Sequence, residues 1–464
     1  MTTINATRTG GSVVTIDGET FNVFESTIHG DVFTAESEGY DRARSVWNGM
    51  IDKRPAVVVK CRGVSDVINA VRFAREHDLV LSLRGGAHNV AGHGTCDGGL
   101  VIDLSGMKGV RVDPITRTAH AQAGLTWAEF DDETLVHGLA TTGGTVSNTG
   151  IAGLTLGGGL GWLMGKHGLT CDNVISFDIV TAGGELITAD ADSHADLFWA
   201  LRGGGGNFGV VTSFRFQLHD VGPAVIGGMI IHPMDHAREL MRFYRDITAD
   251  PPDELEVYMA LMTSPDGDPV AGIMVGYNGD VTEGEKQIKA IREFGSPLAD
   301  LVQPMPYSAR QHMLDDFAPH GPRRYWKSGF LQEFSDDVID VFVDHASNLI
   351  SPMTGIPIFN VHGAATRVAP DATAFGHRIH QWDIDIVSQW LDPEDDERQI
   401  EWTRKFWGDL EPFAGETVYV NHISEDEPSR IETAFGLNYA RLRAVKRTYD
   451  PGNVFRLNHN IPPG

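Results

Sequence analysis

A loop with two consecutive glycines and a histidine is the first place in this chain where the residue types suggest chemistry. It reads Arg84-Gly85-Gly86-Ala87-His88-Asn89. Glycine lets backbone N–H groups come close to a phosphate, and a nest of such groups holds an anion without a basic patch. The loop is therefore typical of a site for a phosphate-bearing cofactor.

Other interpretations of the chemistry-bearing residues fit less well. His88, His93 and Cys96 could ligate zinc, but structural zinc usually pairs two close ligands with a distant second pair, which is not evident here. The GxGxxG pattern over 204–209 follows a predicted helix and precedes a strand, the reverse of a dinucleotide-binding fingerprint. The chain has neither a GxSxG elbow nor a GxxxxGK[ST] loop. We predict no metal and no hydrolase or triphosphatase site.

The glycine–histidine loop is positioned by a predicted βαβ unit. A β-rich run at 56–60 is followed by Ser65 as a helix N-cap, by apolar residues at helical spacing, and by a second strand at 79–83. The loop lies at the carboxyl end of that second strand, where ligands of such folds bind.

Short strands and a glycine-rich segment follow. Strands are expected at 100–104, 109–113 and 118–123, and a helix at 127–137. Residues 141–168 are unusually rich in glycine but also carry Ile, Leu and Trp, so they are not a flexible linker. We expect them to approach a bound ligand closely. A hairpin is then predicted at 174–189, turning at Gly183-Gly184.

The second half of the chain has a different pattern. Beyond Pro223, amphipathic strands alternate with helical segments, as in an α+β unit with an antiparallel sheet covered by helices. The closing stretch from Glu416 is predicted to contain a strand of its own and a helix near 439–449 that stops at Asp450-Pro451-Gly452.

Composition limits the partners and the compartment. The formal net charge of −26 repels nucleic acids and anionic membrane surfaces, so we expect neither as a partner. Nine Lys among 37 basic residues suggest a salt-rich cytoplasm, and an ordinary acidic enzyme fits as well. Three cysteines and no apolar run of membrane-spanning length predict a cytoplasmic protein without a disulfide framework.

Several motifs together resemble a known family. They are RGGAHNVAGHG from Arg84, VIDLSGM from Val101, TGIAGLTLGGGLGWL from Thr149, KHGLTCDNV from Lys166, and DLFWALRGGGGNFGVV from Asp196. These resemble FAD-linked oxidases of the vanillyl-alcohol oxidase or PCMH type. YVNHI from Tyr419 and YARLRAVKRTYDPGNVFRLNHNIPP from Tyr439 resemble the C-terminal segment of the berberine bridge enzyme-like branch.

The resemblance implies an α+β fold in three segments. Residues 1–222, with a core of about 52–220, would form a PCMH-type FAD-binding domain built from the βαβ unit and a mixed sheet. Residues 223–414 would be an inserted substrate domain on a helix-covered antiparallel sheet, and residues 415–464 would return to the FAD domain.

The resemblance also implies the residues that bind the flavin. His88 matches the family's covalently linked histidine, and its alternative role is that of an ordinary hydrogen-bonded loop histidine. Val146 stands where many members have a second linking cysteine, so one covalent bond is expected, and Cys171 is taken as an ordinary buried cysteine. The expected cofactor-binding residues are Arg84, Gly85, Gly86, Ala87, His88, Asn89, Gly92, His93, Gly124, Thr145, Val146, Thr149, Gly150, Gly153, Gly158, Asn173, Ile175, Gly209, Val211, Asn421, Asn458 and Asn460.

For catalysis, the resemblance places the segment 419–422 against the flavin ring, and we expect Tyr419 or His422 to be the base. Tyr325 and Lys327 lie in an aromatic and cationic cluster that could face the substrate cleft, or could be a surface loop whose cations pair with acidic neighbours. Thr149 stands at the family's oxygen-gating position, where a polar residue would suit a slow reaction with oxygen.

The expected function is oxidation of a small-molecule alcohol or amine, with hydride passing to FAD and O2 as reoxidant giving H2O2. A flavin dehydrogenase with another electron acceptor, a reductase using a nicotinamide donor, and a flavin-binding protein with little turnover remain as alternatives. Either a monomer or a homodimer is compatible with the sequence.

Overall fold

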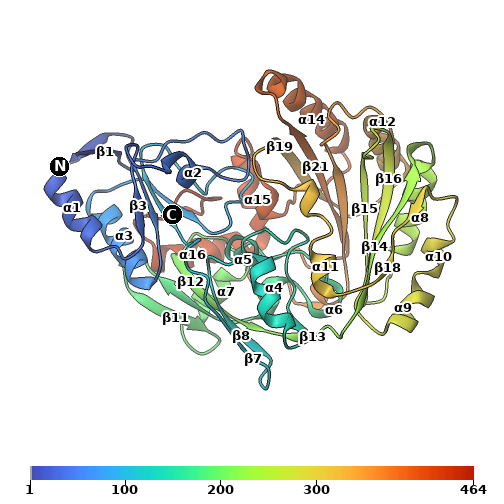
Figure 1. The fold of residues 1–464 in the computed structure, drawn as a ribbon, viewed down its shortest axis with the longest axis horizontal. Helices are drawn as coiled ribbons and strands as arrows, with labels where there is room; N and C mark the ends of the chain where they lie inside the picture. Colours follow the sequence, from blue (N-terminus) through green and yellow to red (C-terminus); the bar gives the residue numbers. More distant parts are fainter. Residues whose placement is uncertain (1–2) are drawn as a thin grey trace.

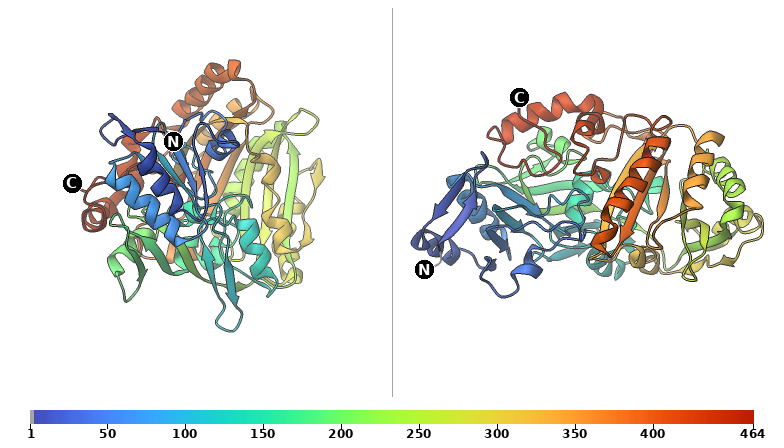
Figure 2. Two further views of the ribbon diagram at one scale, coloured as in Figure 1. Left: turned by 60° about the vertical axis from the view of Figure 1, so that its left-hand side comes forward. Right: turned by 90° about the horizontal axis from the view of Figure 1, so that it is seen from above.

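The computed structural model describes residues 3–464 as two adjoining parts, each built on its own sheets. Residues up to about 222 form one part, and a large sheet with its helices forms the other (Figure 1). Seen from above, the C-terminal helix runs along one side of the first part (Figure 2). The predicted α+β architecture is confirmed.

The first part contains a small sheet in which the predicted βαβ unit is found with one difference. Its order is β3-β4-β6-β5, so β6 lies between the two strands that α3 (Val64–Glu76) connects. The strands β4, β6 and β5 are parallel, and β3 is antiparallel to β4. The strands are β3 (Asp31–Phe33), β4 (Val57–Lys60), β5 (Leu81–Arg84) and β6 (Leu100–Asp103). A helical crossover can leave room for a third strand between the two strands that it connects. Here β6 occupies that place because its backbone pairs with both β4 and β5.

A second, antiparallel sheet completes this part in the order β11-β10-β12-β8-β7. Its hairpin β10–β11 turns at Gly183-Gly184 as predicted. The strands are β7 (Val110–Asp113), β8 (Thr118–Gln122), β10 (Val174–Val180), β11 (Leu186–Asp190) and β12 (Val210–Gln217). Two small ladders are β1 (Ile4–Thr7) with β2 (Val13–Ile16), and β9 (Leu139–Ala140) with β13 (His219–Asp220). Helices of this part are α1 (Gly18–Ser26), α2 (Tyr40–Arg44), α4 (Trp127–Leu135), α5 (Ile151–Leu156), α6 (Met164–His167) and α7 (Ala195–Leu201).

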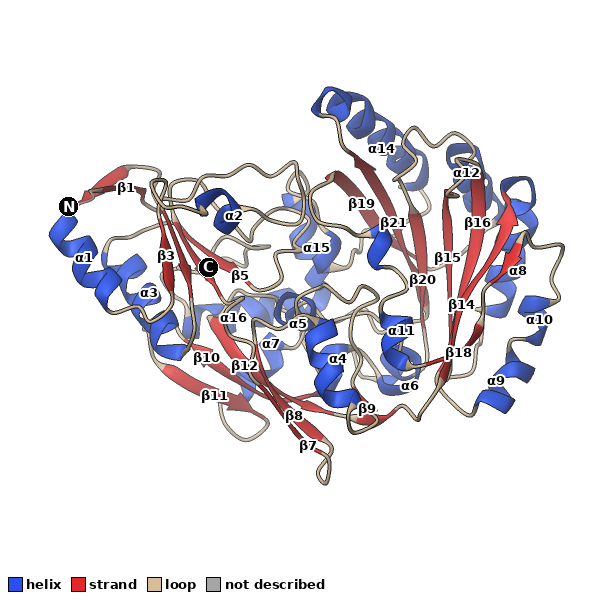
Figure 3. Ribbon diagram, viewed as in Figure 1, coloured by secondary structure: helices blue, strands red, loops and turns tan. Residues whose placement is uncertain are grey.

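The large sheet is antiparallel throughout, in the order β17-β14-β16-β15-β20-β21-β19, with β18 also pairing with β14 (Figure 3). Its strands are β14 (Val225–Pro233), β15 (Leu255–Thr263), β16 (Pro269–Tyr277), β17 (Ala299–Asp300), β18 (Gln303–Met305), β19 (Arg323–Leu331), β20 (Ile356–Val361) and β21 (Gln381–Trp390). Alternate residues along these strands enter two different cores.

Helices cover one face of the large sheet. Apolar residues of α8, α12 and α14 pack with that face into one core. The other face joins a separate core that includes Trp162 and Met164 of the glycine-rich segment and Tyr419 of the C-terminal segment. The helices of this part are α8 (Ala237–Ile247), α9 (Val281–Gln287), α10 (Lys289–Arg292), α11 (Tyr307–Gln311), α12 (Asp336–Ala346), α13 (Ala364–Arg367) and α14 (Asp396–Leu410). This second face of the sheet is therefore turned toward the first part.

The C-terminal segment returns to the first part, but the strand predicted after Glu416 is wrong. The described residues 416–464 contain 3-10 turns, α15 (Ile431–Phe435) and α16 (Tyr439–Tyr449), and no strand. The β-rich run Val418-Tyr419-Val420 is buried between the two parts. Just before it, Gly415 and Thr417 exchange backbone hydrogen bonds with Phe330 of the edge strand β19, but this pairing does not continue into a strand. Within 3–464, no helix is both long and apolar enough to cross a membrane.

Candidate active site

A cavity of about 410 Å³ lies where loops of the first part meet the inner face of the large sheet. Loops around the glycine–histidine motif, the glycine-rich segment and residues 419–422 contribute to its wall, together with strands of the large sheet. The predicted residues that line it are Arg84, Gly85, Gly86, Ala87, His88, Asn89, His93, Thr145, Val146, Thr149, Gly150, Gly153, Gly209, Val211, Tyr419, Asn421, His422 and Asn458. One cavity therefore collects residues from widely separated segments of the chain.

The remaining predicted residues do not line this cavity. They are Gly92, Gly124, Gly158, Asn173, Ile175, Asn460, Tyr325 and Lys327. Several of them support the fold nearby: Asn173 donates to the carbonyls of His167 and Leu169, and a Cβ at Gly124 would lie 1.9 Å from the Leu104 carbonyl oxygen.

Tyr325 and Lys327 belong to a polar network outside the cavity. The Tyr325 hydroxyl donates to Asp426 at 2.6 Å, and the Lys327 ammonium pairs with Asp426 at 3.0 Å and Glu427 at 3.3 Å. Trp326, between them in sequence, points to the other face of β19 and does line the cavity.

The glycine–histidine loop leaves β5 and passes directly against the glycine-rich segment. A Cβ at Gly86 would lie 2.3 Å from the backbone nitrogen of Gly150, so no larger residue fits there. Ala87 has a φ of +62°, which turns the loop. Among the described residues, no protein acceptor receives a backbone N–H from Gly85 through Asn89. These amides form a cradle of the kind that holds phosphate oxygens.

Buried polar atoms along the cavity also lack a partner within the protein. They include the Nε2 atoms of His88 and His459 and the Oδ1 atom of Asn458. Burying such atoms without hydrogen bonds is costly, so a ligand with many polar groups along its length is favoured here. The free amide cradle and these atoms together fit a dinucleotide such as FAD. The Arg84 guanidinium does not count among the groups free to bind a cofactor, because it pairs with Asp103 at 3.1 Å.

His88 lies in an aromatic environment. Its ring stacks on Trp47 with centroids 4.9 Å apart, and the Trp47 ring is 6.3 Å from that of Trp326, which is 4.9 Å from that of His422. Burial, together with the nearby His320 and Arg324, lowers the pKa of His88 to about 3. The imidazole is therefore neutral, with a free nitrogen available for bonding.

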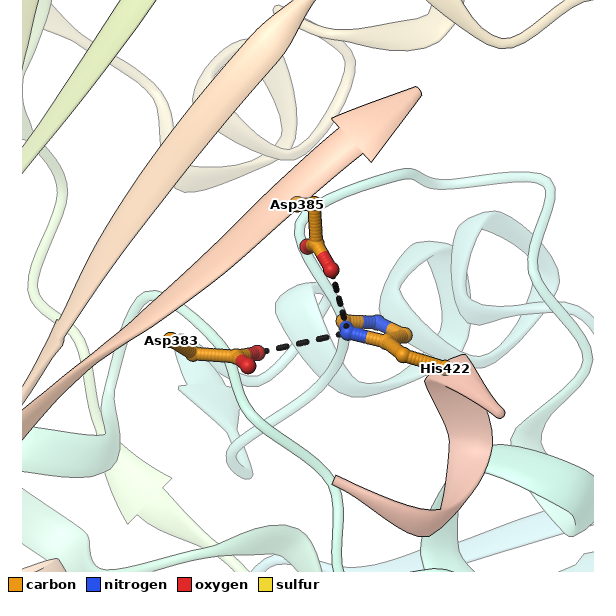
Figure 4. Close-up of side chains that lie close together, drawn as sticks. All are labelled: Asp383, Asp385 and His422. Atoms are coloured by element: carbon orange, nitrogen blue, oxygen red, sulfur yellow. Dashed lines mark ion pairs between the residues drawn. The ribbon is translucent and has the colours of Figure 1, made fainter. Parts of the chain in front are cut away.

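An acidic cluster lies at the other end of this aromatic wall. Asp383 and Asp385 project from the same face of β21, both fully buried, and His422 approaches them from the 3-10 turn Val420–His422 (Figure 4). His422 Nδ1 lies 2.9 Å from Asp385 Oδ1 and 3.3 Å from Asp383 Oδ2. The Trp326 indole N–H donates to Asp385 Oδ1 at 2.8 Å. Of the two carboxylates, only that of Asp385 lines the cavity.

The charges in this cluster are strongly coupled. Burial alone would disfavour the imidazolium, but the two carboxylates outweigh it and raise the pKa of His422 to about 10. Burial and the neighbouring Asp385 raise the pKa of Asp383 to about 7, against the opposing effect of His422. A cationic histidine thus compensates the negative charge of two buried carboxyl groups.

Tyr419 is less suited to accept a proton. Its hydroxyl oxygen accepts the Gly159 backbone N–H at 2.9 Å and the Asn421 amide at 2.7 Å. Burial raises its pKa well above the usual range. Tyr419 therefore fixes the glycine-rich segment against the turn that carries His422.

Asp383, Asp385 and His422 also form the only group in the described chain, 3–464, whose ligand atoms lie close enough to hold a metal, within 4.8 Å of one another. His422 Nδ1 already lies at ion-pair distance from both carboxylates. A proton on the imidazole therefore explains the close approach of the three side chains as well as a bound metal ion would. Adding a chelator to the protein distinguishes a bound metal ion from a proton at this cluster.

Sequence reasoning missed the two aspartates. They stand in Gln381-Trp382-Asp383-Ile384-Asp385, where two acidic residues alternate with apolar ones in a strand buried on both faces. Acidic residues on one face of such a strand are rarely tolerated without a partner, and that pattern could have marked them.

Two family models match the chain. The model described as FAD binding domain matches residues 55–190, and the model described as berberine and berberine like matches residues 418–462. Both matched segments contribute to the cavity.

Relatives align over nearly the whole chain. An FAD-linked oxidoreductase of Dictyostelium discoideum is 33% identical, covering 95% of this chain and 96% of its own. The (R)-6-hydroxynicotine oxidase of Paenarthrobacter nicotinovorans is 28% identical over 94% of this chain and 97% of its own. The crystal structure of 6-hydroxy-D-nicotine oxidase from Arthrobacter nicotinovorans superposes with a TM-score of 0.87 at 26% identity, covering 94% of this chain and 98% of that one.

Proposed function

The chain belongs to the berberine bridge enzyme-like branch of the FAD-linked oxidoreductases, and on that premise we propose that it oxidises an alcohol or amine carbon with Asp385 as the base. The observation that carries this proposal is the position of Asp385 on the cavity wall, paired with His422 and linked by aromatic rings to His88.

The residues that would hold FAD are those of the glycine cradle, with His88 as the attachment point for a single covalent bond, because Val146 offers no second nucleophile. When bound, FAD supplies the acceptor for the hydride that leaves the substrate carbon. The neutral His88 imidazole supports a covalent role, since an unprotonated nitrogen is needed to form the bond.

The protein's own contribution is to receive the proton and hold it. As the C–H electron pair leaves the substrate, its O–H or N–H proton passes to Asp385, and the carbon is left double-bonded to oxygen or nitrogen. The His422 imidazolium compensates the Asp385 carboxylate before transfer. The Trp326 N–H fixes the orientation of the carboxylate.

The reoxidant decides between an oxidase and a dehydrogenase. Oxidation by O2 with release of H2O2 is the first candidate, in keeping with the oxidase relatives. Thr149 lines the cavity with a polar side chain at the position expected to gate oxygen, and this favours the second candidate, a dehydrogenase with another acceptor.

The test has two stages with the purified holoenzyme. In acid, flavin colour should stay with the precipitated polypeptide in the wild type and be lost in His88→Ala. A panel of aryl and alkenyl alcohols and amines is then added without oxygen, and flavin bleaching is followed. Asp385→Asn should keep its flavin and bleach about 10²- to 10⁴-fold more slowly, the usual cost of losing a general base.

Three results would contradict the proposal. The first is bleaching of Asp385→Asn at the wild-type rate. The second is loss of bleaching when a chelator is added to the wild type. The third is that no compound of the panel bleaches the wild-type flavin. Air and a dye acceptor, supplied separately to the bleached wild type, assign the enzyme as an oxidase or a dehydrogenase.

A further inference from the structure

The register of the large sheet places a row of side chains across its inner face, from methionines at one side to the acidic cluster at the other. Met229 pairs with Met274, Met274 with Tyr258, Tyr258 with Phe359, and Phe359 with Asp383. Residues directly opposite one another in an antiparallel sheet project from the same face. The methionines therefore share a face with the carboxylates.

Asp385 joins that face because it lies two residues along β21 from Asp383. The cavity wall beside it is made of apolar side chains from the large sheet and the loops that flank it. They are Met229, Ala260, Met262, Met274, Leu314, Phe317, Ala318, Met353, Ile356, Pro357 and Phe359. A substrate with its reacting carbon at Asp385 extends over this apolar wall.

The few polar side chains of this wall already have partners. The Gln389 amide donates to the carbonyls of Phe317 and Met353, and its oxygen accepts from the Arg324 guanidinium at 2.7 Å. The Trp326 N–H is bound to Asp385. Among the side chains that the large sheet and its loops contribute to the cavity within 3–464, only the Asp385 carboxylate keeps a buried oxygen, Oδ2, without a partner in the protein.

We propose that the substrate has an apolar body, aromatic or alkenyl, with one hydroxyl or amine on the carbon that is oxidised, and that sugars are excluded. This inference rests on the proposed function. A sugar would bury several hydroxyls against methionine and phenylalanine, and one such extra hydroxyl alone costs about 10²-fold in an apolar pocket. Methionine is flexible, so the wall can adapt to bodies of different outline.

Binding to Asp385→Asn holoenzyme tests the proposal without turnover. The probes are cinnamyl alcohol, 4-phenylbenzyl alcohol, glucose and cellobiose, and the readouts are the perturbation of flavin absorption and the rise in unfolding temperature. At least one of the two aromatic alcohols should bind saturably, at least about 10²-fold more tightly than either sugar. Sugars that bind as tightly as the alcohols, or four probes that all fail to bind, would overturn the proposal.

A matched pair of variants locates the contact. Met229 and Met313 are both half-buried beside the same core, but only Met229 lines the cavity. In the Asp385→Asn background, Met229→Gln should weaken binding of the aromatic alcohol roughly tenfold, and Met313→Gln should leave it unchanged. Equal effects in both variants would count against binding on this wall.

The proposed substrate class and the assignment of Asp385 as the base can fail independently of each other. If Asp385→Asn bleaches at the wild-type rate, the assignment of the base fails, whatever binds. If bleaching depends on Asp385 but glucose bleaches the wild type faster than the aromatic alcohols, only the substrate class fails.

Discussion

At the scale of single residues, the site depends on how three ionisable groups share charge. Asp383 and Asp385 are fully buried, and the side chain of His422 is 17% exposed. Two buried carboxylates cannot both ionise without a nearby cation, and His422 is that cation. The turn that carries His422 therefore matters as much as the strand that carries the aspartates.

The pH dependence of substrate oxidation should report this coupling. Replacing His422 with Asn removes the cation that opposes the raised pKa of Asp383 and that pairs with Asp385, so negative charge on the two carboxyl groups becomes less favourable. The acid limb of the pH profile of kcat/KM should move to higher pH by about one unit or more. The measurement is anaerobic flavin bleaching from about pH 5 to pH 9, the range over which carboxyl groups with raised pKa values titrate. An unchanged acid limb would show that His422 does not act on the carboxylates.

At the scale of elements, a buried ion pair inside the C-terminal segment holds a lysine that also anchors this segment to the first part, through a hydrogen bond to the Asn207 carbonyl. The Lys446 ammonium on α16 contacts Asp450 at 2.7 Å and donates to the carbonyls of Asn207 and Phe455. Both charged side chains are fully buried. Since this segment also carries His459 and Asn458 to the cavity, the pair holds part of the candidate site in place.

Removing Lys446 should be costly for stability. Lys446→Met leaves the Asp450 charge buried without a cation, and we expect a loss of about 3–5 kcal/mol in the free energy of unfolding. The pair Lys405–Asp409 on α14 has the same i,i+4 spacing but is exposed, so Lys405→Met should cost no more than about 0.5 kcal/mol. Urea unfolding of both variants gives the comparison, and similar losses in the two would refute it.

Element pairing also shows where sequence patterns stop being informative. The strand predicted after Glu416 is β-rich, yet its backbone bonds to the edge strand β19 only through Gly415 and Thr417, and the chain then enters the 3-10 turn Val420–His422. Likewise, the parallel pair expected across α3 is separated by β6. Local propensity predicts an extended segment, but hydrogen-bonding partners decide whether it becomes a strand.

At the scale of the whole molecule, net charge affects stability. The formal charge of −26 makes the folded chain repel itself, and salt weakens that repulsion by shortening the screening length from about 10 Å at 0.1 M to about 3 Å at 1 M. The unfolding temperature of the holoenzyme should therefore rise by several degrees with added NaCl, measured by a thermal melt.

The shape of that curve separates two causes. Screening saturates within a few tenths of a molar, whereas exclusion of salt from the protein surface gives a rise that continues with concentration. A flat or falling curve would show that the acidic surface carries no significant repulsion at low salt.

Residue types and their spacing along the chain were enough to predict the glycine–histidine loop, the α+β pattern and the resemblance to the flavin family, because all three are local features. Only the tertiary structure brought Asp385 of β21 beside His422, and Met229 and Met274 onto the same face as the carboxylates. Those contacts join residues that are far apart in sequence. The register of the paired strands decides which side chains meet, and no single segment of the chain specifies that register.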